Sequence, residues 1–184
     1  NLGDLVVSAT RNVTKRRLAP TLVNVLDAKI FDRTQSSFLS QALKYQPGVR
    51  VEDNCQNCGF SQVRINGLDG PYSQILVDSR PVYSALAGVY GLEQIPTNMI
   101  ERIEVMRGGG SALFGSSAIA GVINVITKDP TSSSASFSHA IRGIGGLNTF
   151  ENTTNLNATY VTENNKLGIT LFGQLPHRSP YDYT

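Results

Sequence analysis

The alternation of apolar and polar residues divides this chain into two parts that meet near residue 130. The first part contains short β-prone runs separated by turns rich in glycine and proline. These runs are Thr21–Leu26, Val49–Glu52, Ser61–Asn66, Gln74–Asp78, Ile100–Met106 and Val122–Thr127. The helical spacing of Phe38, Leu39, Ala42 and Leu43 begins behind Ser36 or Ser37 as N-cap and ends at Pro47-Gly48, and a helical turn is expected over Ile95–Asn98. Strands mixed with short helices predict a small α+β domain.

The stretch Ile100–Lys128 has the most regular pattern of the first part. Its first run places Ile103 and Val105 on one face and Arg102 and Glu104 on the other, as in a half-buried strand. Its second run is apolar except for Asn124 and Thr127, which suits a strand covered on both sides. The glycines between the runs permit tight turns but supply no side-chain chemistry. The stretch therefore predicts a strand–turn–strand unit and not an active site.

Beyond the hydroxylated run Thr131–Ser134, the pattern changes to longer alternating segments. Leu156, Ala158 and Tyr160 alternate with polar residues, as do Leu167, Ile169 and Leu171, and Ala135–Gly145 alternates less cleanly. Antiparallel strands of about 9–11 residues with one apolar face are typical of transmembrane β-barrels, although an ordinary amphipathic meander has the same pattern. Three strands do not close a barrel, so any barrel here is incomplete.

Composition narrows the possible functions only a little. A chain of 184 residues holds one ordinary domain with a fragment of another. The net charge is +2 and the longest basic run is Lys15-Arg16-Arg17, which gives no sign of a nucleic-acid surface. No stretch approaches the roughly 18 consecutive apolar residues of a membrane helix.

The two cysteines, Cys55 and Cys58, form a CxxC motif flanked by asparagine and glycine. A redox motif is expected at the start of a helix, and a zinc site needs two more ligands, whereas His139 and His177 lie far along the chain. A structural disulfide that closes a loop is the favoured interpretation, with redox and metal roles as alternatives. A disulfide indicates an oxidising compartment.

The order of residues in Ile100–Lys128 resembles the plug-domain signature IERIEVxRGxxSAxYGxxAxxGVINIITK of TonB-dependent outer-membrane receptors. Gly109 departs from it, because many relatives carry proline there. Tyr45–Val49, Val63–Gly67 and Ile75–Val82 resemble further motifs of the same plug. The resemblance implies an α+β plug domain (a small mixed sheet with short helices) followed by antiparallel strands of an incomplete transmembrane β-barrel. It implies the domains 1–17 (TonB-box segment and linker), 18–130 (plug) and 131–184 (first strands of a truncated barrel).

The resemblance also assigns roles to residues. The TonB-binding segment would be Asp4, Leu5, Val6, Val7, Ser8, Ala9 and Thr10, an extended and exposed strand that adds to a partner's sheet edge. Apical loops that contact ligand would be Asp53–Phe60 and Val82–Gly91, with Asn54, Gln56, Asn57, Phe60, Tyr83, Ser84, Leu86, Val89 and Tyr90 as candidate ligand-binding residues. Arg102, Glu104 and Arg107 would pair with charges on the barrel wall, with ordinary surface charge as the alternative.

The function that the resemblance implies is import across the outer membrane of a Gram-negative bacterium, not enzyme catalysis. The implied partners are TonB with its inner-membrane energising complex, outer-membrane lipid, a small-molecule ligand and a surface lipoprotein, and no nucleic acid. No metal site or covalently bound cofactor is expected. The tyrosines of the second loop favour haem or another iron complex as cargo. Alternatives are a cobalamin or glycan importer of the same architecture, a thiol–disulfide enzyme and a soluble periplasmic binding module.

Overall fold

The structure is a computed structural model that describes residues 5–55, 60–68, 70–82, 92, 95–143, 150–164 and 166–178. The chain folds as two compact units, Asn1–Lys128 and Asp129–Thr184. Within the described ranges, none of the helices has the length and apolar character needed to span a membrane.

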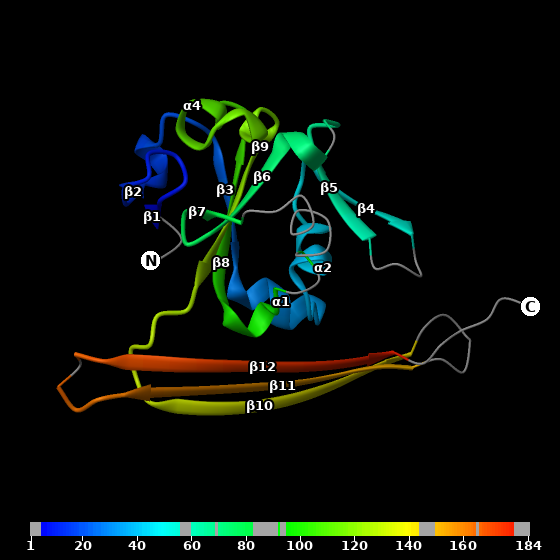
Figure 1. Ribbon diagram of the computed structural model, residues 1–184, viewed down its shortest axis with the longest axis vertical. Coiled ribbons are helices and arrows are strands. Elements are labelled where there is room, and N and C mark those ends of the chain that lie inside the picture. The colour runs from blue at the N-terminus through cyan, green and yellow to red at the C-terminus, as the bar shows by residue number, and fades with distance from the viewer. Residues whose placement is uncertain are drawn as a thin grey trace, which may run out of the picture. The chain divides into compact units, whose positions relative to one another are not determined.

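A five-stranded mixed sheet forms the centre of the first unit (Figure 1). Its strands, in spatial order, are β3 (Val23–Asp27), β8 (Ile100–Arg107), β9 (Gly121–Thr127), β6 (Ser73–Val77) and β7 (Arg80–Pro81). The β6–β9 pair is parallel and the other neighbours are antiparallel. Two separate hairpins pair β1 (Leu5–Val6) with β2 (Thr14–Lys15) and β4 (Val49–Cys55) with β5 (Phe60–Ile65). The predicted strands are therefore confirmed, with shifts of up to three residues at their ends.

The helices in the described part of this unit are all short. They are η2 (Arg16–Leu18), α1 (Ala28–Thr34), α2 (Leu39–Leu43), η3 (Gly70–Tyr72), η5 (Thr97–Met99), α4 (Ser111–Phe114) and η6 (Ser116–Ala118). Helix α2 confirms the expected helix, but its N-cap is Phe38 and not Ser36 or Ser37. The Gln41 side chain instead accepts a hydrogen bond from the Ser37 amide at 2.8 Å. Helix α1, whose N-cap is Asp27, and the helical turns within the glycine-rich connection were not expected from the sequence.

The central sheet has a hydrophobic layer on each face. On one face, helices α1 and α2 and the β4–β5 hairpin cover Ile103, Val105, Ile123 and Val125. On the other face, the sheet residues Val23, Leu76, Met106 and Val122 are covered by two parts of the chain. These are Val6 and Ala9 of the N-terminal segment (residues 5–10), and Phe114 and Ala118 of the helical turns. The N-terminal segment is thus part of the second hydrophobic layer of the domain.

Both central strands are covered on both sides. The expectation is confirmed for β9, whose residues Gly121–Val125 are all buried. For β8 the expectation of a half-buried strand is wrong, because Glu104 and Met106 on its second face are 0% exposed. The N-terminal segment, which is distant in the sequence, packs over this face. The alternation of residues within β8 does not predict that contact.

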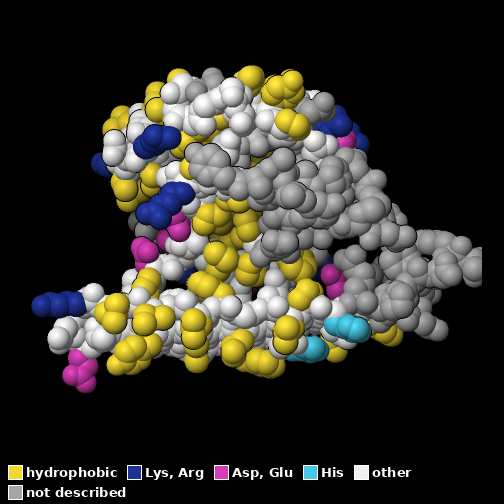
Figure 2. Space-filling model, viewed as in Figure 1, with side chains coloured by type: hydrophobic (Ala, Val, Ile, Leu, Met, Phe, Trp, Pro, Cys, Tyr) yellow, Lys and Arg dark blue, Asp and Glu magenta, His cyan; other side chains and the backbone are white. Residues whose placement is uncertain are grey.

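The second unit is a three-stranded antiparallel sheet of β10 (Ser134–Gly143), β11 (Phe150–Val161) and β12 (Gly168–Arg178). Directly paired residues share a face, and Phe137 pairs with Leu156 while Ala158 pairs with Leu171. The face that carries these residues is apolar and exposed, and hydrophobic side chains line the sheet in Figure 2. The other face carries Ser136, Asn157 and Thr170. The strand length and the one apolar face agree with the predicted barrel-type strands.

Candidate functional site

Two polar residues lie side by side in the middle of the second face of the central sheet. Glu104 on β8 is paired with Asn124 on β9, and both are 0% exposed. A buried carboxylate is costly unless hydrogen-bond donors compensate for the water it has lost. Most of the donors to Glu104 come from the N-terminal segment, which lies over this pair.

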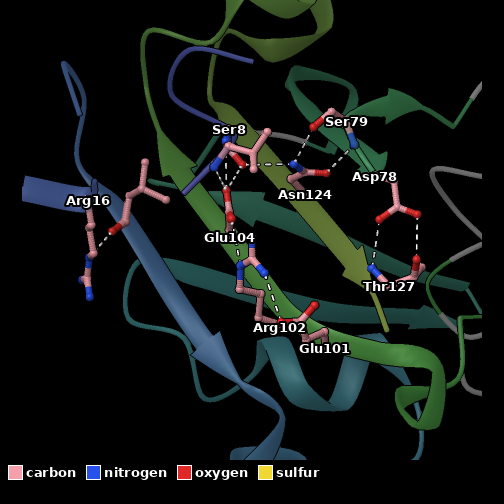
Figure 3. A network of polar contacts seen from close by, with 11 residues as sticks. Ser8, Arg16, Asp78, Ser79, Glu101, Arg102, Glu104, Asn124 and Thr127 are labelled. Carbon is pink, nitrogen blue, oxygen red and sulfur yellow. Dashed lines mark hydrogen bonds and ion pairs between the residues drawn. The ribbon is translucent and has the colours of Figure 1, made fainter. Parts of the chain in front are cut away.

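The N-terminal segment is held by Glu104 through three hydrogen bonds (Figure 3). The backbone amides of Val7 and Ser8 each donate to Glu104 Oε2 at 2.9 Å. The Ser8 hydroxyl donates to the same oxygen at 2.7 Å. Hydrogen bonds to a charged acceptor contribute about 1.5–3 kcal/mol each, more than neutral ones. Glu104 is therefore a specific docking point for this segment.

Arg102 balances the buried charge from the other side. Its Nε donates to Glu104 Oε1 at 3.0 Å, and its Nη1 lies 3.4 Å from Glu101 Oε1. The Arg102 side chain is 12% exposed, so the ion pair is shielded from bulk water. Glu104 consequently keeps a charged partner that does not belong to the N-terminal segment.

Further contacts fix the same segment to the domain. Strand β1 pairs with β2, with Val6 opposite Thr14. Val6 and Ala9 are buried in the second hydrophobic layer. The Arg11 guanidinium lies over the Phe114 ring, 5.0 Å from its centroid. The expectation of an exposed segment is therefore wrong for Val6, Ser8 and Ala9, because they are packed against the sheet.

Asn124 extends the polar network away from the N-terminal segment. Its Nδ2 donates to Ser8 Oγ at 3.2 Å and to Ser79 Oγ at 3.1 Å, and its Oδ1 accepts from the Ser79 amide at 2.9 Å. Asp78, the other residue of this turn, accepts from the Thr127 amide and hydroxyl at 2.9 and 2.8 Å. The turn between β6 and β7 is thus joined to the N-terminal segment through one side chain (Figure 3).

Comparison with protein families identifies the fold that carries this network. The family model of the TonB-dependent Receptor Plug Domain matches residues 15–122. This chain belongs to that family. The match covers the plug from β2 to the start of β9, so Glu104 and the strands around it lie within the plug.

Relatives of the plug include transporters and receptors of known type. The vitamin B12 transporter BtuB of Vibrio vulnificus (strain CMCP6) is 38% identical over 136 residues, which are 73% of this chain and 22% of that protein. The siderophore receptor PirA from Acinetobacter baumannii has a TM-score of 0.72 at 24% identity, covering 87% of this chain and 25% of its own. A mutant of the ferric enterobactin receptor PfeA from Pseudomonas aeruginosa has a TM-score of 0.68 at 26% identity, covering 88% and 25%.

The chain therefore spans about a quarter of the length of these relatives or less. A plug domain followed by antiparallel barrel strands, as predicted, is the fold class that the comparisons confirm. Receptors of this family lie in the outer membrane of Gram-negative bacteria, which confirms the predicted location.

The ligand-binding residues predicted in the plug fall mostly outside the described part of the chain. These are Gln56, Asn57, Tyr83, Ser84, Leu86, Val89 and Tyr90, together with Cys58 of the predicted disulfide and Asp4 of the predicted TonB-binding segment. Asn54 and Cys55 lie at the end of β4 and Phe60 begins β5, and only their backbone is described. The roles of all these residues stay predictions.

The three predicted barrel-contact residues are neighbours on β8 but have different surroundings. Glu104 is fully buried, and both of its oxygens have partners within the plug. Arg102 bridges Glu101 and Glu104. The Arg107 side chain lies against Gly48, whose φ is +81°. Contact of these residues with a barrel wall stays a prediction.

The docking role of Glu104, Asn124 and Ser79 was not foreseen from the sequence. One signal was present: Asn124 interrupts an otherwise apolar run, and a buried amide needs partners. The identity of those partners depends on two contacts separated by 116 and 45 positions along the chain. Among the described residues, no group of three or more His, Cys, Asp or Glu side chains gathers as metal ligands would.

Proposed function

We propose that this chain is the plug and first barrel strands of a receptor that imports a bulky metal chelate by energy-coupled transport. In this proposal the segment 4–10 is the site for TonB, which is energised by its inner-membrane complex. Ligand contact outside the cell loosens the segment, TonB binds it by strand addition, and force on the segment moves part of the plug. The receptor carries out no chemical reaction on its cargo.

The observation that supports this proposal most directly is the docking of the segment on Glu104. Strand addition requires free backbone amides and carbonyls along the segment. In the structure the amides of Val7 and Ser8 donate to Glu104, and β1 is paired with β2. In the docked segment the amides of Val7 and Ser8 are therefore occupied, and undocking would free them for a partner strand. A docked state and a released state are what a coupled transporter requires.

Cobalamin is the first cargo candidate, because the vitamin B12 transporter BtuB is 38% identical to this chain, against 24% and 26% for PirA and PfeA. An iron chelate, either a siderophore complex or haem, is the second candidate, since structural neighbours of the plug bind siderophores. Both classes are large chelates around one metal ion. The tyrosines in the predicted apical loop suit stacking on either one.

Deletion of residues 4–10 from the full-length receptor tests the coupling. We expect uptake to fall to the background of a receptor-free strain, while binding of the same ligand to whole cells is retained. Uptake that persists in this variant would contradict the proposal. A matched control deletes residues 1–3, which leaves residues 4–10 and the residues that pair with them in the chain.

The cargo is tested in a strain that lacks its own receptors and expresses the full-length protein. Cells receive cyanocobalamin, a ferric catecholate or haem as the only source of the nutrient. We expect growth on cyanocobalamin at concentrations too low for diffusion to support. Growth on an iron source alone would replace the first candidate by the second, and growth on none would reject the metal-chelate class.

A further inference from the structure

The Asn124 side chain forms hydrogen bonds both to the N-terminal segment and to the turn between β6 and β7. It is 0% exposed, so water cannot substitute for a lost partner. One hydrogen of its Nδ2 goes to Ser8 and the other to Ser79, and its Oδ1 is used by the Ser79 amide. Both hydrogens of the Asn124 amide are used in these bonds. A rotation of the amide that changes its bond to Ser79 therefore also changes its bond to Ser8.

The Ser8 hydroxyl continues this chain of hydrogen bonds. It accepts from Asn124 and donates to Glu104 at 2.7 Å. Consecutive hydrogen bonds of this kind polarise and orient one another in a buried setting. The Ser8–Glu104 bond is therefore strongest while Asn124 holds the Ser8 oxygen in place.

The turn at the other end of the chain is held in an unfavourable backbone conformation. Asp78 and Ser79 have φ values of +48° and +65°, in the left-handed region that side-chain-bearing residues avoid. Such residues persist where surrounding contacts over-determine them. Here the contacts are Asp78 with Thr127 and Ser79 with Asn124. Loss of the contact with Asn124 removes part of the stabilisation that keeps Asp78 and Ser79 at positive φ.

The position of the turn in the sequence connects it to the predicted ligand loop. Ser79 precedes β7, and Tyr83, the first predicted ligand-binding residue of that loop, follows Ser79 by four positions. The two residues of β7 connect the turn to this loop in the sequence, and Asn124 connects the turn to Ser8.

We propose that Asn124 couples the conformation of the 78–79 turn to the docking of residues 5–10, so that a shift of the turn releases the segment. The inference rests on the proposed function, because it names the residue through which ligand contact reaches the TonB-binding segment. Asn124 is a positioning residue in this scheme, since it binds neither ligand nor TonB. Coupling of this kind is reciprocal: docking of the segment must stabilise the turn by the same factor.

The test is hydrogen–deuterium exchange in the purified full-length receptor, followed at the amides of Val7 and Ser8. The decisive variant is Ser79→Gly, which removes the hydroxyl but favours the positive φ of the turn. Coupling through Asn124 predicts faster exchange of both amides, by roughly two- to twelve-fold for one neutral hydrogen bond. Unchanged or slower exchange of both amides would overturn the proposal, because loss of the hydroxyl that orients Asn124 would then not loosen the segment.

Two further variants isolate the path. In an Asn124→Ala background, Ser79→Gly should add no further change, whereas a persistent effect would mean that the coupling bypasses Asn124. Thr127→Val loosens the same turn through Asp78 without touching Asn124. It should accelerate exchange at Val7 and Ser8 while Asn124 is present and have no effect in the Asn124→Ala background. No acceleration in the first case, or the same acceleration in both, would overturn the proposal.

The reciprocal measurement covers the case in which Asn124→Ala does not fold. Ser8→Ala should accelerate exchange of the Ser79 amide, which donates to Asn124, by about the factor that Ser79→Gly produces at Val7. Unaltered exchange at Ser79 would refute the coupling. None of these measurements depends on transport, so failed uptake with intact exchange coupling would reject the proposed function and leave this inference standing.

Discussion

At the scale of single residues, Gly121 has the tightest surroundings of the described glycines. A Cβ atom added there would meet the Met106 carbonyl oxygen of the neighbouring strand, and φ is +155°. Gly108 has φ +68°, and no atom lies within 4 Å of its added Cβ. The two glycines thus separate the cost of crowding from the cost of backbone conformation.

We expect Gly121→Ala to destabilise the plug by about 1–3 kcal/mol more than Gly108→Ala, because crowding of a packed core adds to the backbone cost. Chemical denaturation of the full-length receptor, with a probe in the plug, measures both variants. Gly108→Ala is the control for positive φ alone. Equal losses would mean that β8 and β9 move apart at no cost, contrary to the close approach at Gly121.

A second prediction at this scale concerns the charge of Glu104. Glu104→Gln keeps the size of the side chain but replaces charge-assisted bonds to Val7 and Ser8 with neutral ones. The difference of about 1–1.5 kcal/mol corresponds to roughly ten-fold faster exchange of those two amides. Glu101→Gln is the matched control, because Glu101 also contacts Arg102 but not the segment. Equal acceleration in both variants would assign the docking to Arg102 instead of Glu104.

At the scale of elements, the glycine-rich connection between β8 and β9 has a conformation that its family signature does not predict. Gly109 has φ +66°, whereas the related signature carries proline there, which fixes φ near −65°. Gly109→Pro should therefore reduce stability by about 3 kcal/mol or rearrange the connection. Thermal unfolding of the full-length receptor measures the loss, with Gly109→Asn as a control that tolerates positive φ. A neutral Gly109→Pro would show that the connection adopts the proline-compatible turn.

The sequence predicted the elements far better than the contacts between them. Strands such as β8 and β9 were found because alternation and apolar runs are local signals. Helix α1 was missed because its seven residues bury only Phe31, which leaves almost no periodic pattern. The docking of the N-terminal segment was missed because the partners of Ser8 lie 96 and 116 positions away. Such pairings depend on the order of strands in the sheet, which local patterns do not encode.

At the scale of the whole molecule, the sheet of β10, β11 and β12 has one face suited to contact with lipid. Its apolar face carries Phe137 and Leu156, which are 70% and 55% exposed. Exposed apolar side chains in this arrangement suit contact with lipid, and the plug family places the protein in the outer membrane. The neighbouring residue Ser136 lies on the opposite, polar face of the same strand.

Phe137→Arg should impair insertion of the full-length receptor, because an arginine facing lipid near the midplane costs about 2–4 kcal/mol. Ser136→Arg places the same charge one residue away on the polar face, and we expect near-normal insertion. The folded barrel is measured in outer-membrane fractions by its altered mobility on gels run without heating. If Ser136→Arg lost insertion and Phe137→Arg did not, the two faces of the sheet would have to be exchanged. Equal insertion of both variants would indicate that Phe137 does not face lipid.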